Sequence, residues 1–352
     1  MFDVSIVGLG FIGRPIAQLC LKAGHSTHGI DNDTGVLATC SNFGLLTLSS
    51  SYDSVSNSDI IVVCVPTPLT KNEIETSTLE LVIDHLAKRV KHTSLIIIES
   101  TVYPTYIERV LIPRLRLAGC QAGVVYCPER GDVTSTMSDI EKIARVFGAS
   151  DQNSATLAMK FYSSIIAAPL KQMSNITTAE CVKAVENSFR DINIAFVNEL
   201  AQSLSDIGVS THEVITGSAT KPFGYMPFYP GPGVGGTCIP MSSHSLLRGV
   251  STTLSMPMTA RKINQSMPLF IARKINELAR SRTIGVLGIS FKPNTSDTRD
   301  SPAVDVIKTL SSMGNTVIAH DPHVSSSSPL ADVLQCSVIA VLTGHAAFKE
   351  LQ

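Results

Sequence analysis

Short apolar runs and helical patterns alternate through the first half of the chain. Runs rich in β-branched residues predict strands at Val4–Val7, Ser26–Ile30, Ile60–Val65, Leu95–Glu99 and Gly123–Tyr126. Between them lie stretches with apolar residues at helical spacing, such as Leu79–Val90 and Tyr106–Leu117. This alternation is typical of a doubly wound α/β domain with a parallel sheet. We therefore predict an α/β fold whose first domain covers residues 1–175.

The next segment, Thr177–Asp206, has the apolar spacing of one long helix. Thr177 and Glu180 have the spacing of a capping box, which predicts that the helix begins there. Lys183 and Asn187 are one turn apart and project from the same face, although a solvated helix face would also explain this pair. A helix of this length suggests a link between two domains and a homodimer interface.

A stretch rich in glycine and proline, Lys221–Pro240, follows and is expected to be neither helix nor strand. Helical patterns fill roughly 242–281. A second α/β unit then begins, with predicted strands at Thr283–Ile289, Thr316–His320 and Ser337–Leu342 and a helix opened by Ser301 and Pro302. We predict a helical middle domain over 176–280 and a C-terminal Rossmann-like domain over 281–352.

Composition narrows the classes of partner. The 352 residues include 28 Lys and Arg against 29 Asp and Glu, and no basic run appears, which argues against nucleic acid and against an anionic membrane surface. The eight cysteines are scattered without metal-ligand spacing, so reduced thiols and no metal site are expected. No apolar run approaches the roughly 18 residues that cross a bilayer. The chain is expected to be a cytoplasmic protein that acts on a small molecule.

The N-terminal strand leads into a glycine motif. Gly8, Gly10 and Gly13 form G-x-G-x-x-G between a predicted strand and a predicted helix. Gly8 would make the tight turn, Gly10 would admit a pyrophosphate, and Gly13 would let the helix pack on the strand. Asp31 ends the second strand, where a carboxylate accepts hydrogen bonds from a ribose 2′-hydroxyl and favours NAD over NADP. A Rossmann dinucleotide-binding domain is predicted, although any βα turn that needs glycine is the structural alternative.

Polar residues follow three other predicted strands. Thr67 comes after the third strand, Thr101 after the fourth and Glu129 after the fifth. Ligands of open α/β sheets bind outside the carboxyl ends of the strands, so these residues should face one crevice together with Gly10. Turn chemistry could explain each residue taken alone.

The loop before residue 240 combines flexible backbone with a thiol. Gly231, Gly233, Gly235 and Gly236 would let main-chain N–H groups approach a ligand, and Cys238 at the end of the loop is a candidate nucleophile. This pattern suggests covalent chemistry on a phosphorylated molecule. A surface loop with an incidental buried thiol is the alternative.

Several motifs stand in the order found in a known family. GLGFIG, CVPTP, EST, PER, AECVKAVENSFRDINIAFVNEL, KPFGYMPFYPGPGVGGTCIP and GISFKPNTSDTRDSP resemble the UDP-glucose/GDP-mannose dehydrogenase family, whose members oxidise nucleotide sugars to uronic acids. The resemblance covers nearly the whole chain. The central block most closely resembles the UDP-N-acetylglucosamine 6-dehydrogenase branch, with UDP-N-acetylmannosamine and UDP-glucose dehydrogenases as alternatives.

The resemblance implies a four-electron oxidation of the sugar C6 hydroxymethyl group by two NAD⁺ in succession. Cys238 would capture the intermediate aldehyde as a thiohemiacetal, which is oxidised to a thioester and then hydrolysed. Lys183 would stabilise the oxyanion with Asn187 beside it. Thr101 and Glu129 would position the hydrolytic water, with Glu129 a candidate general base.

Binding residues are also implied by the resemblance. The Tyr229–Gly236 backbone, including Gly231 and Gly235, would cradle a UDP-sugar, and Lys292 would pair with its diphosphate. Glu129, Lys183 and Asn187 would contact the sugar as well. The residues that would bind NAD are Gly8, Gly10, Phe11, Ile12, Gly13, Asp31, Thr67, Thr101 and Arg299.

The chain departs from the family pattern in two places. Ser242 occupies the position, four residues after Cys238, where the family has an aspartate that helps to activate the hydroxyl or a water. The C-terminal α/β domain is expected to be shortened. Two alternatives therefore stay open: a relative that binds NAD or UDP-sugar with impaired catalysis, and an ordinary two-electron dehydrogenase of the 6-phosphogluconate or 3-hydroxyacid type.

Overall fold

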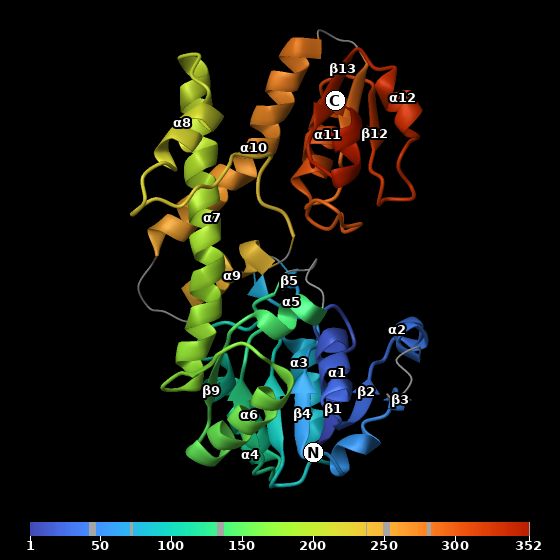
Figure 1. The fold of residues 1–352 in the computed structure, drawn as a ribbon, viewed down its shortest axis with the longest axis vertical. Helices are drawn as coiled ribbons and strands as arrows, with labels where there is room; N and C mark the ends of the chain where they lie inside the picture. The colour runs from blue at the N-terminus through green and yellow to red at the C-terminus, as the bar shows by residue number, and fades with distance from the viewer. Residues whose placement is uncertain are drawn as a thin grey trace. The chain divides into compact units, whose positions relative to one another are not determined.

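The chain divides into two compact units, which Figure 1 shows as ribbons. The computed structural model describes residues 1–41, 47–70, 73–131, 137–236, 238–248, 254–279 and 283–351. The first unit comprises Met1–Val185 and Ser245–Ser251, and the second comprises Glu186–His244 and Thr252–Gln352. The predicted three-domain boundaries, 1–175, 176–280 and 281–352, stay a prediction.

The first unit contains an eight-stranded sheet with the order β10-β9-β8-β7-β4-β1-β2-β3. Its strands are β1 (Asp3–Val7), β2 (Ser26–Ile30), β3 (Thr47–Ser49), β4 (Ile60–Val63), β7 (Leu95–Ile98), β8 (Gly123–Tyr126), β9 (Arg145–Ala149) and β10 (Leu170–Gln172). Six neighbouring strands of this sheet, β8, β7, β4, β1, β2 and β3, pair in parallel, which confirms the predicted doubly wound sheet. Strand β9 instead pairs antiparallel with β8. No sequence pattern predicted β3, β9, β10 or the short hairpin of β5 (Leu69–Thr70) and β6 (Glu73–Ile74).

The central strands are apolar on both faces because helices cover both faces of the sheet. All four residues of β4 and of β7 are buried. Ile61 and Ile96 belong to one hydrophobic core, while Ile60 and Ile97 belong to the other. The surrounding helices are α1 (Gly13–Lys22), α2 (Thr34–Cys40), α3 (Ser77–Ala87), α4 (Ile112–Leu117), α5 (Met137–Lys142) and α6 (Gln152–Ile165), with a 3₁₀ turn at Asp53–Ser56 and a π-helical turn at Ile107–Leu111 that leads into α4.

Helix α7 (Ile176–Asp206) is the predicted long helix, but the predicted capping box is wrong. The Asn175 side chain accepts the Thr178 N–H at 2.7 Å, so the helix begins before Thr177. Glu180 instead points into the first unit, where its carboxylate accepts the N–H of Thr105 at 2.6 Å and of Ile107 at 3.0 Å. These bonds hold the backbone where Thr105 has φ of 76°, a left-handed conformation that a threonine rarely adopts.

The buried Glu180 should make stability depend on pH. Burial raises the pKa of its carboxyl from 4.5 to about 7, against the opposing effect of the two backbone N–H groups. A raised folded-state pKa means that the stabilising contribution is complete below about pH 4.5 and is lost as pH rises through about 7, a change of about 3 kcal/mol at most. We expect Glu180→Gln to flatten this dependence. Thermal unfolding at pH 5 and pH 8 should show a relative gain for the variant only at pH 8, and Glu199→Gln, on an exposed face of α7, should show no such gain.

The second unit confirms the predicted second α/β region. Its sheet has the order β12-β11-β13, with parallel pairing on both sides of β11. Its elements after α7 are α8 (Thr211–Ser218), α9 (Cys238–Arg248), α10 (Ser255–Ala279), β11 (Ile284–Leu287), α11 (Pro302–Ser312), β12 (Val317–His320), α12 (Leu330–Leu334), β13 (Val338–Val341) and a 3₁₀ turn at Ala346–Leu351. The expected loop therefore ends earlier than predicted, because Cys238–Pro240 form the first turn of α9.

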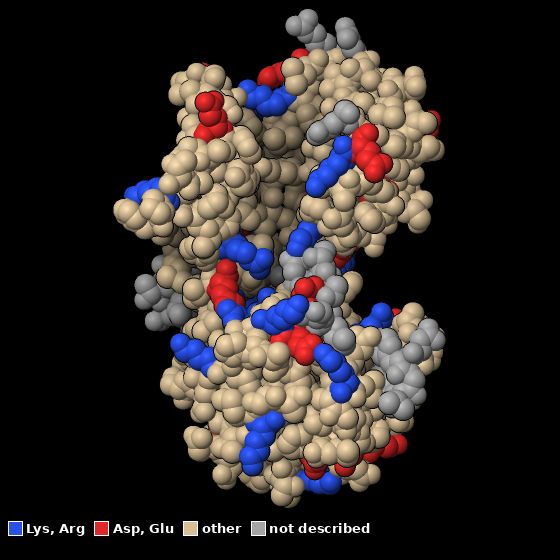
Figure 2. Space-filling view, in the orientation of Figure 1, with Lys and Arg blue, Asp and Glu red and all other residues tan. Residues whose placement is uncertain are grey.

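Charged side chains of both signs are interspersed on the face shown in Figure 2, and neither sign dominates it. None of the helices in the described ranges combines the length and apolar character needed to span a membrane. Within those same ranges, no group of three or more His, Cys, Asp or Glu side chains is arranged to hold a metal ion.

Candidate functional site

The turn after β1 shows which glycines the fold requires. Gly8 has φ of 89°, and a Cβ there would lie 2.7 Å from the Cys64 carbonyl oxygen. A Cβ on Gly13 would lie 1.8 Å from the Gly8 carbonyl oxygen, so α1 could not pack on β1. A Cβ on Gly10 would meet no atom within 4 Å. Close backbone contacts explain why glycine is needed at positions 8 and 13, whereas the open space at Gly10 fits the close approach of a pyrophosphate.

This difference can be measured. Gly10→Ala should fold normally and bind NAD⁺ about tenfold more weakly, because the methyl group would occupy the space that a pyrophosphate needs. Gly13→Ala should lower the thermal unfolding midpoint sharply. Calorimetric titration of NAD⁺ and thermal unfolding of both variants would test the assignment, and unchanged affinity in Gly10→Ala would contradict it.

Asp31 lies where the sequence predicted a ribose contact. One of its oxygens accepts the Leu9 N–H at 2.7 Å and the other accepts the Asp33 N–H at 2.9 Å. The side chain is partly exposed, and a carboxylate has about four acceptor positions. Asp31 thus ties the glycine turn to the end of β2 and retains capacity for ribose hydroxyls. Phe11 in the same turn is largely exposed, while Ile12 packs against the core.

The sheet order brings the other predicted strand-end residues to one edge. Because β1, β4, β7 and β8 are parallel, Thr67, Thr101 and Glu129 all follow strands that end at the edge where Gly10 lies. The Thr67 hydroxyl donates to the Thr101 carbonyl oxygen at 2.7 Å, so these two loops are in direct contact. Their roles in binding a cofactor or a water remain predictions.

Glu129 and Lys183 come together in the first unit. The Lys183 ammonium donates to the main-chain oxygen of Glu129. The Glu129 carboxylate is nearly buried and accepts hydrogen bonds from the N–H groups of Arg130 and Gly131 and from the guanidinium of Arg145. Arg145 was not predicted as a site residue, because its only signal in the sequence is a basic residue at the start of an apolar run.

Asn187 lies one turn further along α7 and contacts α9. Its amide donates to the Ser242 hydroxyl at 2.8 Å and accepts a hydrogen bond from Arg190. Asn187 and Ser242 are both buried. Cys238 is the first residue of α9 and stands one turn before Ser242, and its side chain lies outside the described part of the chain. The Asn187–Ser242 bond therefore fixes the start of α9, with the candidate nucleophile, against α7.

A buried polar cluster joins the helices around this contact. Asp191 on α7 accepts hydrogen bonds at 2.8 Å from Arg261 and Asn264 on α10 and from Ser243 on α9. Asn264 in turn accepts a hydrogen bond from Asn198 at 2.9 Å. These side chains are almost completely buried. This cluster could not be predicted from local sequence patterns, because its residues come from three separate helices.

Packing within the protein accounts for three of the four loop glycines, and the approach of their N–H groups to a ligand stays a prediction. A Cβ on Gly235 would lie 2.6 Å from Pro302, and one on Gly233 would lie 2.8 Å from the Asn264 carbonyl oxygen. Gly236 similarly faces the Phe291 ring. The fold itself requires these three glycines, because the loop packs tightly against the C-terminal region of its own unit.

Gly231 and Tyr229 differ from the rest of that loop. A Cβ on Gly231 would meet nothing within 4 Å, and its N–H donates to Asn198 at 2.9 Å. The Tyr229 ring is half exposed and stacks on His212, with 5.2 Å between ring centroids. These residues present backbone and an aromatic face at the surface of the loop, and their contact with a substrate stays a prediction.

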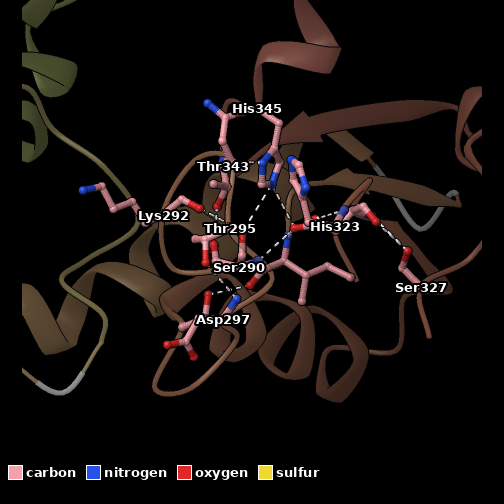
Figure 3. A network of polar contacts seen from close by, with 12 residues as sticks. Ser290, Lys292, Thr295, Asp297, His323, Ser327, Thr343 and His345 are labelled. Carbon is pink, nitrogen blue, oxygen red and sulfur yellow. Dashed lines mark hydrogen bonds and ion pairs between the residues drawn. The ribbon is translucent and has the colours of Figure 1, made fainter. Parts of the chain in front are cut away.

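A second network shapes the loop that carries Lys292 (Figure 3). Ser290 donates to the Lys292 carbonyl oxygen at 3.0 Å, and Thr343 donates to the Ser290 carbonyl oxygen at 2.7 Å. The His345 ring accepts the Asn294 N–H at 2.9 Å. In Figure 3 the Lys292 side chain extends away from this network. The loop backbone is therefore fixed by these hydrogen bonds, and a contact of Lys292 with a diphosphate stays a prediction.

The network ends on Asp321, which follows β12 as Asp31 follows β2. Its carboxylate accepts the N–H groups of Ile289 and Ser290 at 2.8 and 2.9 Å and meets the His345 ring at 2.9 Å. Burial opposes its ionisation, but these hydrogen bonds outweigh burial and lower the pKa of Asp321 to about 2. Unlike Asp31, Asp321 is buried and fully engaged by the protein. The second α/β region therefore does not present an Asp31-like carboxylate to a ribose.

A cavity of about 140 Å³ lies beside this loop in the second unit. Its lining includes Gly233, Ser290, Phe291, Pro302 and Thr343. Close by in sequence, Arg299 forms a two-pronged ion pair with Asp297, at 2.9 and 2.6 Å. This pair lowers the pKa of Asp297 and holds the mostly exposed arginine near its own loop. A role of Arg299 at the cofactor stays a prediction.

Models of one protein family match three stretches of this chain. The NAD binding domain of the UDP-glucose/GDP-mannose dehydrogenase family matches residues 34–166. The central domain of that family matches residues 177–266, and its UDP binding domain matches residues 285–352. The UDP binding match contains the Lys292 loop and the Asp321 network.

Individual proteins are similar over the full chain. A UDP-N-acetyl-D-mannosamine dehydrogenase of Pyrococcus horikoshii is 30% identical over 380 residues, covering 99% of this chain and 90% of that protein. The structure of UDP-D-ManNAc dehydrogenase from Pyrococcus horikoshii matches with a TM-score of 0.89, covering 98% and 90% of the two chains at 30% identity. A UDP-glucose dehydrogenase structure from Pyrobaculum islandicum has a TM-score of 0.91, covering 100% and 92%, and its 24% identity supports likeness of fold.

Proposed function

This chain belongs to the UDP-glucose/GDP-mannose dehydrogenase family, as an NAD-dependent oxidoreductase of UDP-sugars, and we propose that it oxidises C6 of a UDP-N-acetylhexosamine to the uronic acid. The contact of Asn187 with Ser242 carries the proposal, because it fixes the helix that begins at Cys238 against the helix that carries Lys183 and Asn187. These are the residues that a covalent acyl-transfer mechanism requires.

In the proposed reaction, C6 of the sugar loses a hydride in each of two steps, and bound NAD⁺, which the Gly8–Gly13 turn and Asp31 would hold, would supply the oxidising equivalents. The C6 hydroxyl loses a proton in the first step and becomes an aldehyde, to which the Cys238 thiol adds to give a thiohemiacetal. Loss of the second hydride and a proton gives the thioester, and water then releases the carboxylate and regenerates the thiol. Lys183 and Asn187 would stabilise the oxyanion, while Glu129 and Thr101 would orient the water.

The identity of the sugar is the finer part of the proposal. The sequence resemblance favours UDP-N-acetylglucosamine, whereas the relatives that are 30% identical are UDP-N-acetyl-D-mannosamine dehydrogenases. We therefore put UDP-N-acetyl-D-mannosamine first and its gluco epimer second. The Lys292 loop and most of the lining of the adjacent cavity belong to the region that matches the UDP binding domain, which supports a uridine diphosphate carrier.

NADH formation followed by absorbance would test this function. Purified protein is mixed with NAD⁺ and, in separate reactions, UDP-N-acetyl-D-mannosamine, UDP-N-acetylglucosamine and UDP-glucose. Two NADH per sugar with either N-acetyl sugar would support the proposal, and the faster of the two identifies the substrate. One NADH per sugar would indicate an ordinary two-electron dehydrogenase. Binding of NAD⁺ without any turnover would indicate an impaired relative, as Ser242 in place of an aspartate would allow.

We also propose a homodimer that uses α7. Val185, Phe189 and Phe196 on this helix are about half exposed, with exposed fractions of 53%, 47% and 57%. Exposed large apolar side chains on one helix are typical of an interface. Light scattering on the purified protein would give the oligomeric state directly.

A further inference from the structure

Arg145 lies between two carboxylates at the sheet edge that carries the candidate site. Because β9 runs antiparallel to β8, its first residue, Arg145, lies where β8 ends. Its guanidinium donates to the Glu129 carboxylate through one terminal nitrogen and to Glu99 at 3.2 Å through the other. Arg145 and Glu99 are fully buried and Glu129 is 6% exposed, so water contributes little to this cluster.

One guanidinium cannot neutralise two buried carboxylates. The other cation that contacts this cluster is the Lys183 ammonium, which donates to the main-chain oxygen of Glu129 and adds positive charge beside that residue. Glu99 is therefore the less compensated carboxylate in a medium of low polarity, which favours uptake of a proton. The acidic groups beside these carboxylates, Cys20, Cys64, Cys127 and Tyr162, are all buried, and burial raises their pKa, so they stay neutral. The proton must therefore be held by Glu99 or by Glu129.

The hydrogen bonds differ between the two carboxyl groups. The second oxygen of Glu129 accepts N–H groups from Arg130 and Gly131, which can only donate and so favour the ionised form. The second oxygen of Glu99 lies 2.7 Å from the Tyr162 hydroxyl, which can either donate or accept. Burial, the largest effect, raises the pKa of Glu99, and the Arg145 charge opposes this only in part. A protonated Glu99 can therefore donate to Tyr162, while a protonated Glu129 would lose a bond.

We propose that Arg145 is a positioning residue that holds Glu129 ionised and in one orientation, and that Glu99 is the carboxyl group that carries the shared proton. The effect of Arg145 on turnover rests on the proposed function, in which Glu129 orients the hydrolytic water. The protonation of Glu99 stands on the geometry of the buried cluster alone.

Isosteric variants of the two glutamates that contact Arg145 distinguish the roles of their carboxyl groups. Glu99→Gln replaces a protonated carboxyl by a neutral amide and should lower kcat by no more than about threefold. Glu129→Gln removes the ionised carboxylate and should lower kcat by about a hundredfold with little change in KM. Arg145→Met should resemble Glu129→Gln, and Arg145→Lys should recover part of the loss. Equal losses in both glutamine variants, or full activity of Arg145→Met in a folded protein, would overturn the proposal.

An infrared measurement tests the protonation without requiring turnover. The spectrum of the wild-type protein at neutral pH should contain a band from a buried protonated carboxyl group that Glu99→Gln lacks and Glu129→Gln retains. A band that disappears in Glu129→Gln but not in Glu99→Gln would overturn the assignment. If no sugar is oxidised, the proposed function fails, and this spectrum still decides the state of Glu99.

Discussion

Cys238→Ala is expected to abolish production of the uronic acid, with a loss of at least about a thousandfold in kcat. The first hydride transfer needs no thiol, but the aldehyde cannot be oxidised further as a thiohemiacetal without Cys238. The variant should therefore release at most one NADH per bound sugar, in a reaction that readily reverses. Spectroscopic counting of NADH per sugar, together with chromatography of the sugar product, would measure this directly.

A second cysteine provides the matched control. Cys336 is partly buried in the C-terminal region of the second unit and takes no part in the proposed chemistry. Cys336→Ala should keep kcat within about twofold of the wild type, because substitutions near the surface and away from the functional site usually have small effects. If Cys238→Ala still forms two NADH per sugar, the covalent mechanism is wrong and hydration of a free aldehyde must replace it.

The apolar strands could be predicted because burial on both faces leaves a clear signal. The strand at Ser26–Ile30 and the strand at Gly123–Tyr126 have the predicted bounds, and the other predicted strands differ at their ends. Strand β9 was missed because its first residue, Arg145, is charged and its partner strand runs in the opposite direction. Arg145 is buried only because Glu99 and Glu129 come from two neighbouring strands, and no local pattern contains that information.

Contacts between segments that lie far apart in the sequence explain why other features could not be predicted. The spacing of Thr177 and Glu180 fits a capping box. The Glu180 carboxylate instead accepts hydrogen bonds from the backbone N–H groups of Thr105 and Ile107, which lie about seventy residues earlier in the sequence. The ligand contact of Gly235 stays a prediction, and the structure adds a reason for this glycine that the sequence did not contain, because Pro302 lies where its Cβ would be. A sequence shows that a glycine or a carboxylate is needed at a position, and only the fold shows which neighbour needs it.

Arg261→Met should destabilise the second unit by about 3–5 kcal/mol, because it leaves the buried Asp191 carboxylate without its cation. The remaining donors to Asp191, Ser243 and Asn264, are neutral and cannot balance the charge. Adding Asp191→Asn to Arg261→Met should restore much of the loss, since the double variant buries no charge. Arg114→Met provides the control, because Arg114 is 40% exposed in its pair with Asp84, and pairs of this kind contribute less than about 1 kcal/mol.

Differential scanning calorimetry suits this test, because a chain with two compact units need not unfold in a single step. Arg261→Met should move the transition that belongs to the second unit, while the Gly13→Ala variant moves the one that belongs to the first.

The Arg261→Met variant should also affect turnover. Ser243, which donates a hydrogen bond to Asp191, neighbours Ser242 on α9, so loosening of this helix should lower kcat more than it raises KM. A calorimetric trace for Arg261→Met that matches the wild type would mean that the Asp191 cluster contributes nothing to stability, and α9 would then be held by the Asn187–Ser242 contact and its apolar packing.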